Sequence, residues 1–223
     1  DDSSATLLAL LGLSLGASAA AAAADSDADS AAGPGGCVAT QDYTQSFDLA
    51  NVDLAASGSG YKISGPTGNN EQFGQTVAGA GDFNGDGVGD ILIGAPYLGG
   101  AARGGGYIIF GQSGTDRADV DVSLLSTAER VRISGENAGD QLAERVDSIS
   151  AAGDMNGDGL GDVLLGSYRA NGFDGAAWLV YGSASGGDVS LNGVSAADGM
   201  EIRSNFGEYI GWSLAGAGAV NGD

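Results

Sequence analysis

The sequence predicts an all-β fold, and two features of the chain lead to that expectation. Apolar runs of five or six residues, such as DILIG, YIIFG, DVLLG and AWLVYG, end in glycine, whereas helical periodicity is hard to find beyond residue 30. A fixed order of segments also recurs along the chain. Glycine supplies 42 of the 223 residues without the period that collagen requires, and 43% hydrophobic residues are enough for a packed core.

An internal repeat organises the chain after residue 46. Each copy passes from an Asp-rich segment to an alternating strand, which carries Ile63, Ile133 or Ile202, and then to a stretch that ends in NGD. A period near 70 residues with about four short strands per copy is typical of a propeller blade. We therefore predict β-propeller blades of four antiparallel strands. The predicted repeats cover residues 47–117, 118–186 and 187–223, of which the last is truncated.

The most distinctive segment of each repeat is a run of acidic residues separated by glycines. Residues 81–96 read GDFNGDGVGDILIGAP, and residues 153–168 read GDMNGDGLGDVLLGSY. Oxygen-bearing side chains occupy positions 1, 3, 5 and 9, the carbonyl of position 7 adds a donor, and glycine permits the tight turn. Hard oxygen donors in this spacing suit Ca²⁺. The candidate ligands are Asp82, Asn84, Asp86, Val88 and Asp90 in the first copy, and Asp154, Asn156, Asp158, Leu160 and Asp162 in the second.

The acidic loops also have alternative interpretations. An EF-hand requires a bidentate Glu at position 12, where this chain has Ile93 or Leu165, and a strand follows instead of a helix. Mg²⁺ suits the loops less well because it demands a stricter octahedral geometry. Hairpin turns that bind no metal stay open as the alternative. A third, degenerate copy of the motif has Ala219, Asn221 and Asp223, and whether it binds Ca²⁺ is left open.

The order of these motifs resembles the FG-GAP repeat of the integrin α-subunit β-propeller and its bacterial secreted relatives. The matching segments are Phe73-Gly74, residues 82–90, and Gly94-Ala95-Pro96. The second copy departs from the pattern: Arg145-Val146 stand at the FG position, unless a small insertion after Leu142-Ala143 shifts the alignment. The third copy has Ile210-Gly211 at that position.

The resemblance implies a propeller of about seven blades, so we expect this chain to be a fragment with about three repeats. It also implies that loops on one face bind partners while the calcium loops brace the other. Our leading hypothesis is an extracellular calcium-binding scaffold for adhesion or for recognition of a protein or glycan. The alternatives are an accessory propeller of a secreted hydrolase, and a surface-layer or matrix protein that uses the repeats structurally.

Composition excludes several classes of function. With 29 acidic and 8 basic residues the net charge is −21, which repels phosphate backbones and makes nucleic-acid binding improbable. Histidine is absent and Cys37 is the single cysteine, so histidine-based catalysis, zinc sites of that type and an intrachain disulfide are ruled out. We expect no enzymatic activity from this chain. Trp178 is expected in the core, and Trp212, which aligns with Gln75, at a partly exposed position.

The N-terminal part differs from the repeats. Residues 1–24 hold an apolar stretch followed by small residues, which is typical of an export signal; a membrane span is the less favoured alternative. Residues 25–46 have the Asp, Ser, Ala and Gly composition of a flexible linker. We therefore expect a secreted or cell-surface protein whose repeat region does not insert into the membrane.

Overall fold

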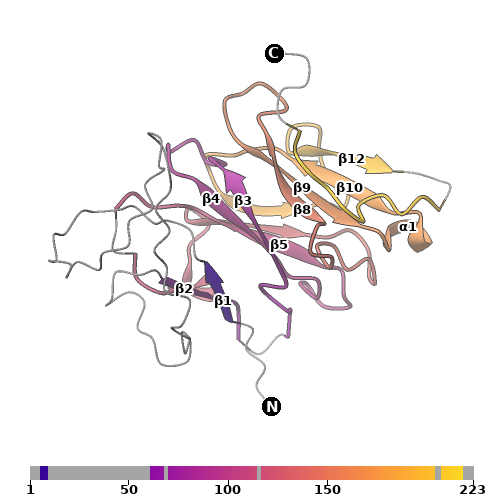
Figure 1. The fold of residues 1–223 in the computed structure, drawn as a ribbon, viewed down its shortest axis with the longest axis horizontal. Coiled ribbons are helices and arrows are strands. Elements are labelled where there is room, and N and C mark those ends of the chain that lie inside the picture. Colours follow the sequence, from indigo (N-terminus) through magenta and orange to yellow (C-terminus); the bar gives the residue numbers. More distant parts are fainter. Residues whose placement is uncertain (1–5, 10–60, 68–69, 115–116, 204–206, 218–223) are drawn as a thin grey trace, which may run out of the picture.

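The computed structural model describes residues 6–9, 61–67, 70–114, 117–203 and 207–217, and it confirms the expected all-β fold (Figure 1). Helical structure in these residues is limited to a 3₁₀ turn, η1 (Val122–Leu124), and a short turn, α1 (Ala170–Phe173). No helix of the described part has the length and apolar character that a membrane crossing requires. The predicted linker and the third acidic motif lie outside the described residues. So does the signal-like segment, except for strand β1 (Thr6–Ala9).

One sheet contains the first acidic motif. Its strands follow the order β11-β7-β5-β4-β3, with antiparallel pairing from β3 to β7 and parallel pairing between β7 and β11. The four antiparallel strands are short, and β4 and β5 are the apolar runs beside glycine that the sequence predicts. Their bounds, with that of the fifth strand, are β3 (Thr76–Gly81), β4 (Asp90–Gly94), β5 (Gly105–Ile109), β7 (Arg130–Ser134) and β11 (Gly187–Ser190).

A second sheet repeats the antiparallel part of the first. Its order is β12-β10-β9-β8, and every neighbouring pair is antiparallel. Both sheets therefore have the four antiparallel strands that the blade pattern predicts. The strands are β8 (Ile149–Gly153), β9 (Asp162–Ser167), β10 (Ala176–Val180) and β12 (Gly199–Arg203).

The chain crosses between neighbouring sheets. After β10 it forms β11, which pairs with β7 of the first sheet, and it then returns to the second sheet as β12. The chain follows the same path between β5 and β7. There β6 (Val120–Asp121) pairs in parallel with β2 (Tyr61–Ser64) of a third sheet, β1-β2-β6, before the chain enters β7. Among the described residues, the first and third predicted repeats thus each contribute strands to two sheets, and the second contributes strands to all three.

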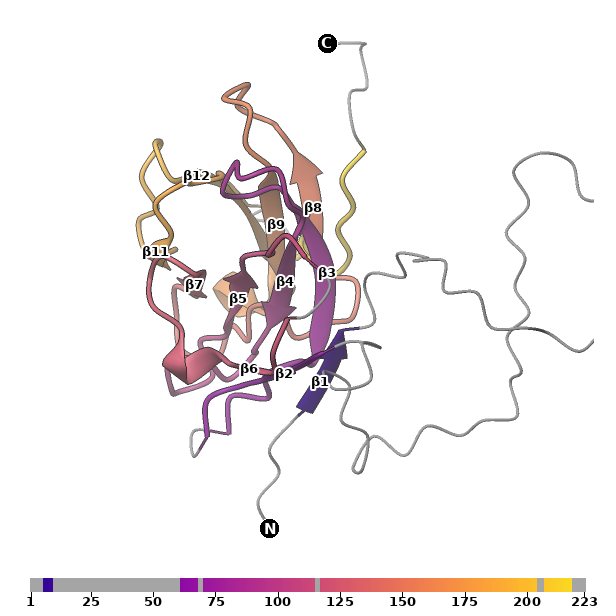
Figure 2. The ribbon, with the colours of Figure 1, turned by 90° about the vertical axis from the view of Figure 1, so that its left-hand side faces the viewer.

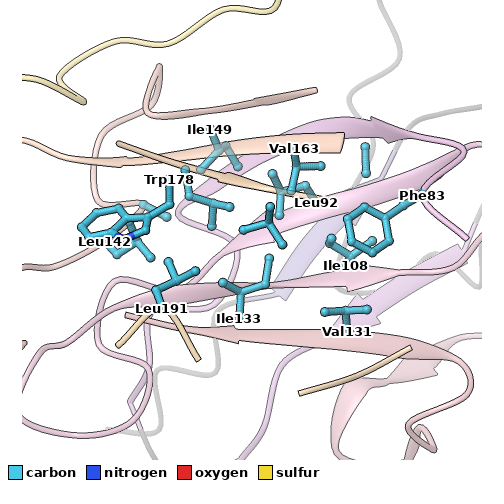
Figure 3. Close-up of a cluster of buried hydrophobic side chains, with 14 of the residues drawn as sticks. Phe83, Leu92, Ile108, Val131, Ile133, Leu142, Ile149, Val163, Trp178 and Leu191 are labelled. Carbon is cyan, nitrogen blue, oxygen red and sulfur yellow. The ribbon is translucent and has the colours of Figure 1, made fainter. Parts of the chain in front are cut away.

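Two apolar cores lie on the two faces of the first sheet. One contains Leu92, Ile108 and Ile133 of the first sheet with Val163 and Trp178 of the second, and Figure 3 shows these side chains gathered between the strands. The other lies toward β2 and β6. Its members include Ile63, Ile93, Tyr107, Ile109, Val120 and Val122. Trp178 is 1% exposed, which confirms its expected core position.

The FG position of the second repeat is settled by hydrogen bonds. The N–H of Gly74 donates to the carbonyl of Gly94 at 3.0 Å, and the N–H of Ala143 donates to the carbonyl of Gly166 at 3.0 Å. Since Gly94 and Gly166 are equivalent positions, Ala143 takes the place of Gly74. Leu142-Ala143 therefore replace Phe-Gly, and residues 144–146 are an insertion, so Arg145-Val146 do not occupy the FG position.

Candidate metal centre

The two acidic loops connect β3 to β4 and β8 to β9. Each follows a register shift at the end of the first strand, between Gly79 and Gly81 or between Ala151 and Gly153. Gly81 and Gly153 have φ values of +71° and +80°, which glycine adopts without strain. The chain therefore turns out of the sheet in the same way in both copies.

The loops lie side by side at one end of the two sheets, as Figure 2 shows at the top of the view. The N–H of Gly161 donates to the carbonyl of Asp82 at 2.8 Å, and the N–H of Ser183 donates to the carbonyl of Phe83 at 2.9 Å. Phe83 itself is fully buried between the sheets. Main-chain bonds therefore fix the first loop against the second.

In the first loop, oxygen atoms of Asp82 and Asn84 converge on one backbone N–H. The N–H of Asp86 donates to Oδ1 of Asp82 at 3.0 Å and to Oδ1 of Asn84 at 3.1 Å. Asn84 Nδ2 also donates to Oδ2 of Asp86 at 2.9 Å, and the N–H of Val88 donates to Oδ1 of Asp86 at 2.8 Å. Positions 1, 3, 5 and 7 of the motif are thus brought together.

The second loop has the same geometry. The N–H of Asp158 donates to Oδ1 of Asp154 and to Oδ1 of Asn156, both at 3.0 Å. Asn156 Nδ2 donates to Oδ2 of Asp158 at 2.8 Å, and the N–H of Leu160 donates to Oδ1 of Asp158 at 2.8 Å. Two loops 72 residues apart therefore share the hydrogen bonds that join positions 1, 3, 5 and 7.

The aspartate at position 9 differs from the other three positions because it is buried. Asp90 is 3% exposed, and its carboxylate accepts the N–H groups of Phe83 at 2.8 Å, Asn84 at 3.3 Å and Gly111 at 2.7 Å. Burial raises the pKa of Asp90, while the three N–H donors lower it, and the net direction is upward. This carboxylate ties the loop to the end of β5.

Asp162 does the same in the second copy. It is fully buried and accepts the N–H groups of Met155 at 2.7 Å and Gly182 at 2.8 Å. Burial likewise raises the pKa of Asp162, against the two N–H donors and with a smaller upward effect from Asp158 and Asp154.

The charge of the two loops is not balanced by basic side chains. The ion pairs of the described residues use acidic partners elsewhere in the fold, namely Asp119, Glu136, Glu144, Asp188 and Glu201. Six carboxylates thus lie in two adjoining loops, where the partners seen are backbone and side-chain amide N–H groups. Like charges this close raise the free energy of the folded state.

The donor set fits a hard divalent cation in its chemistry, because every candidate side chain presents oxygen. Within the described residues, however, no three acidic, cysteine or histidine side chains are grouped closely enough to enclose an ion. The third carboxylate of each loop is directed to backbone N–H groups instead. Each loop brings together the candidate ligands at positions 1, 3 and 5, and the aspartate at position 9 is buried beneath them.

One feature of this site was not predicted from the sequence. Asp90 and Asp162 accept backbone N–H groups, and the even spacing of the three aspartates in each loop does not distinguish them from the others. The insertion of residues 144–146, which the sequence allows as one of two alignments, is confirmed by the hydrogen bond of Ala143 and adds Glu144 and Arg145 near the opposite end of the second sheet.

The geometry agrees with comparisons with known proteins. A model of the FG-GAP repeat matches residues 73–109, which run from Phe73 through the first acidic loop to the end of β5. Residues 73–109 form an FG-GAP repeat. The resemblance that the motifs suggested is confirmed.

Curated relatives match a larger part of the chain. Integrin alpha pat-2 of Caenorhabditis elegans is 33% identical over 100 residues, or 44% of this chain and 7% of that protein. Integrin alpha-7 of Mus musculus is 31% identical over 158 residues, which are 68% of this chain and 11% of that protein. Phosphatidylinositol-glycan-specific phospholipase D of Homo sapiens is 32% identical over 152 residues, which are 64% of this chain and 16% of that protein. The chain thus spans less than a fifth of the length of these relatives.

Proposed function

We propose that this FG-GAP chain is part of an extracellular recognition or adhesion scaffold, secreted or held at the cell surface, whose two acidic loops each bind one Ca²⁺. The residues that would hold the ion are those at positions 1, 3, 5, 7 and 9 of each loop. They are Asp82, Asn84, Asp86, Val88 and Asp90 in the first loop, and Asp154, Asn156, Asp158, Leu160 and Asp162 in the second.

The observation that carries the calcium proposal is the uncompensated charge of two similar acidic loops in contact. Asp82 and its partner loop are joined by a main-chain hydrogen bond, and the described ion pairs include none of the six carboxylates. A bound divalent cation would remove most of this repulsion. The residues that bind the ion would hold each hairpin in one conformation. Asp86 and Asp158 lie at the exposed side of their loops.

The recognition part of the proposal is supported by the similarity to integrin alpha chains. The absence of histidine and the structural character of the loops favour a binding role over catalysis for this chain. The partner would be an extracellular protein or glycan.

Thermal melting of the full chain in EDTA, Mg²⁺ and Ca²⁺ tests the calcium proposal. We expect Ca²⁺ to raise the melting temperature more than Mg²⁺ does at the same concentration, because ligand binding to the folded state stabilises it. The double variant Asp86→Asn with Asp158→Asn should lose this rise. Asp147→Asn, which removes an exposed carboxylate outside both loops, is the matched control and should keep it.

Equal melting temperatures of the wild-type chain in the three buffers would show that the loops are metal-free turns. A calcium effect that survives the double variant would place the ion elsewhere.

A second candidate function has a specific observation in its favour. The similarity to phosphatidylinositol-glycan-specific phospholipase D covers 64% of this chain. The FG-GAP repeats could therefore serve as the accessory domain of a secreted hydrolase. The sequence of the complete gene decides between the two, since a catalytic domain beside the repeats would favour the hydrolase.

A further inference from the structure

A cluster of aromatic and arginine side chains lies at the end of the second sheet opposite the acidic loops. Tyr168 directly follows β9, whereas the second acidic loop precedes it, and α1 marks this end in Figure 1. We call the cluster the aromatic patch, and it consists of Arg145, Tyr168, Arg169, Phe173, Tyr209 and Trp212. Its rings are exposed to an unusual degree: Phe173 is 48%, Tyr209 50% and Trp212 45% exposed, which confirms the expected exposure of Trp212.

The members of the aromatic patch contact one another. The ring centroids of Tyr168 and Trp212 lie 4.8 Å apart with the rings edge to face, and those of Tyr209 and Trp212 lie 6.3 Å apart. The guanidinium carbon of Arg145 lies 4.0 Å from the centre of the Trp212 ring and 5.8 Å from that of Tyr168. These contacts hold the exposed groups in one arrangement, which lowers the entropic cost of binding a partner.

The blade fold itself does not require these residues. The equivalent of Tyr168 in the first sheet is Pro96, and Trp212 aligns with Gln75. The matching bridges of Gly104 and Gly175 place Phe173 opposite Ala102. Arg145 belongs to the insertion of residues 144–146, which the first repeat lacks. The first sheet forms the same strands without any of them, so packing of the blade does not explain the aromatic patch.

The aromatic patch contains two arginines, and one of them is paired with an adjacent glutamate. The chain has a net charge of −21 and 8 basic residues, of which two are in the patch. Arg169 is paired with Glu144 through two hydrogen bonds, at 2.9 and 3.1 Å. Arg145 is in none of the ion pairs of the described residues and lies over the rings instead. A guanidinium held in this way is suited to bind a carboxylate.

We propose that the aromatic patch binds an acidic, partly apolar peptide segment of a partner protein, with a carboxylate on Arg145 and apolar side chains against Trp212 and Phe173. Tyr, Trp and Arg dominate the binding energy of protein interfaces. A peptide is favoured over a glycan because exposed Phe173 and Val146, which is 77% exposed, offer no hydrogen bonds to sugar hydroxyls. This inference rests on the proposed recognition function and names its site.

Selection of peptides from a random 12-residue phage library on the full chain tests the proposal. We expect the selected peptides to be enriched in Asp or Glu beside apolar residues. Synthetic versions should bind Arg145→Gln and Trp212→Ala at least about tenfold more weakly than wild type. The controls are Lys62→Gln, which removes a positive charge elsewhere, and Tyr97→Ala, which removes a ring that is 37% exposed; both should bind normally.

Peptides without acidic enrichment, or equal binding by Arg145→Gln, would overturn the proposal. So would Trp212-dependent binding on a glycan array with no peptide selected, or a dimer of the chain that Trp212→Ala converts to a monomer. The calcium-dependent melting shift is measured on the same Arg145→Gln variant. If Arg145→Gln keeps the calcium-dependent shift and loses peptide binding, the aromatic patch acts separately from the calcium loops. If the wild-type chain shows no calcium-dependent shift, only the calcium proposal is contradicted.

Discussion

Within each acidic loop, the aspartates fall into two environments. Asp82 and Asp86 lie toward the surface, whereas Asp90 is buried and accepts three backbone N–H groups. The motif spaces all of them evenly, so the sequence predicts one role for the whole set. In the structure the third aspartate holds the hairpin through these backbone hydrogen bonds.

This difference predicts unequal effects of two substitutions in EDTA. Asp90→Ala leaves the N–H groups of Phe83, Asn84 and Gly111 without their acceptor, which should cost about 2–4 kcal/mol of unfolding free energy. Asp86→Ala removes an exposed carboxylate and should cost less than about 1 kcal/mol. Urea unfolding followed by circular dichroism measures both. Equal losses for the two variants would contradict the proposed division of roles.

Tyr107 is a second residue whose environment can be tested. It is 3% exposed, and its hydroxyl donates to Oε2 of Glu71, itself 8% exposed, at 3.0 Å. Burial, with the charge of Glu71 and the hydrogen bond to it, raises the pKa of Tyr107 to about 12. Its counterpart in the second sheet is Trp178, so the second repeat lacks this buried hydrogen bond.

The raised pKa predicts a loss of stability in alkali. Between about pH 10 and 12 the folded chain keeps the proton of Tyr107 while an unfolded tyrosine loses it, so the unfolding free energy falls as the pH rises through this window. Tyr107→Phe should cost about 1–3 kcal/mol at pH 8, because Glu71 loses its donor. The difference between the two proteins should narrow by pH 11. Urea unfolding at both pH values tests this, and a constant difference would contradict it.

At the scale of elements, the parallel strands β6 and β11 join neighbouring sheets. In β11, Val189 is paired with Ile133, and in β6, Val120 is paired with Ile63. The residues two positions further, Val122 and Leu191, are each 1% exposed, and each belongs to the core beside its sheet. The short strands therefore attach each sheet to the preceding one.

Removal of the Leu191 side chain should weaken the attachment. Leu191→Ala leaves a cavity beside β7 and should cost about 2–5 kcal/mol of unfolding free energy. Leu124→Ala, at a position that is 82% exposed, is the control and should change the unfolding free energy by less than about 0.5 kcal/mol. Thermal melts of the two variants distinguish them. A Leu191→Ala chain as stable as the control would mean that β11 does not hold the sheets together.

The elements show what sequence can and cannot predict here. The runs DILIG and DVLLG are local and regular, and they became β4 and β9 as expected. The attachment by β11 was not predicted, because its parallel pairing joins residues 56 positions apart, Gly187 and Val131, and no local pattern records it. The acidic loops were located from spacing alone, whereas the burial of Asp90 depends on Gly111 at the end of another strand.

At the scale of the whole molecule, the two sheets differ in what covers their outer faces. Val131 and Ile133 of β7 are 1% and 0% exposed beneath the second sheet. Their equivalents in β12, Met200 and Ile202, are 46% and 42% exposed. Since these positions match strand for strand, the outer face of the second sheet has the apolar pattern of a face that receives a further blade.

Equivalent substitutions on the two faces should therefore have opposite results. Ile133→Lys buries a charge between the sheets and should unfold the chain or cost several kcal/mol of unfolding free energy. Ile202→Lys should change the unfolding free energy by about 0.5 kcal/mol or less and reduce self-association, because the residue is exposed. Circular dichroism melts and analytical ultracentrifugation measure both effects. Severe destabilisation by Ile202→Lys would show that this face is already packed.

Isothermal titration of Ca²⁺ into the EDTA-treated full chain measures whether the paired acidic loops are calcium sites. We predict uptake of about two ions per chain, one for each loop described here, with Asp86→Asn and Asp158→Asn each removing about one. The control variant Asp147→Asn should bind as wild type does. No heat of binding, or a stoichiometry that neither loop variant changes, would contradict the claim and leave the loops as hydrogen-bonded turns.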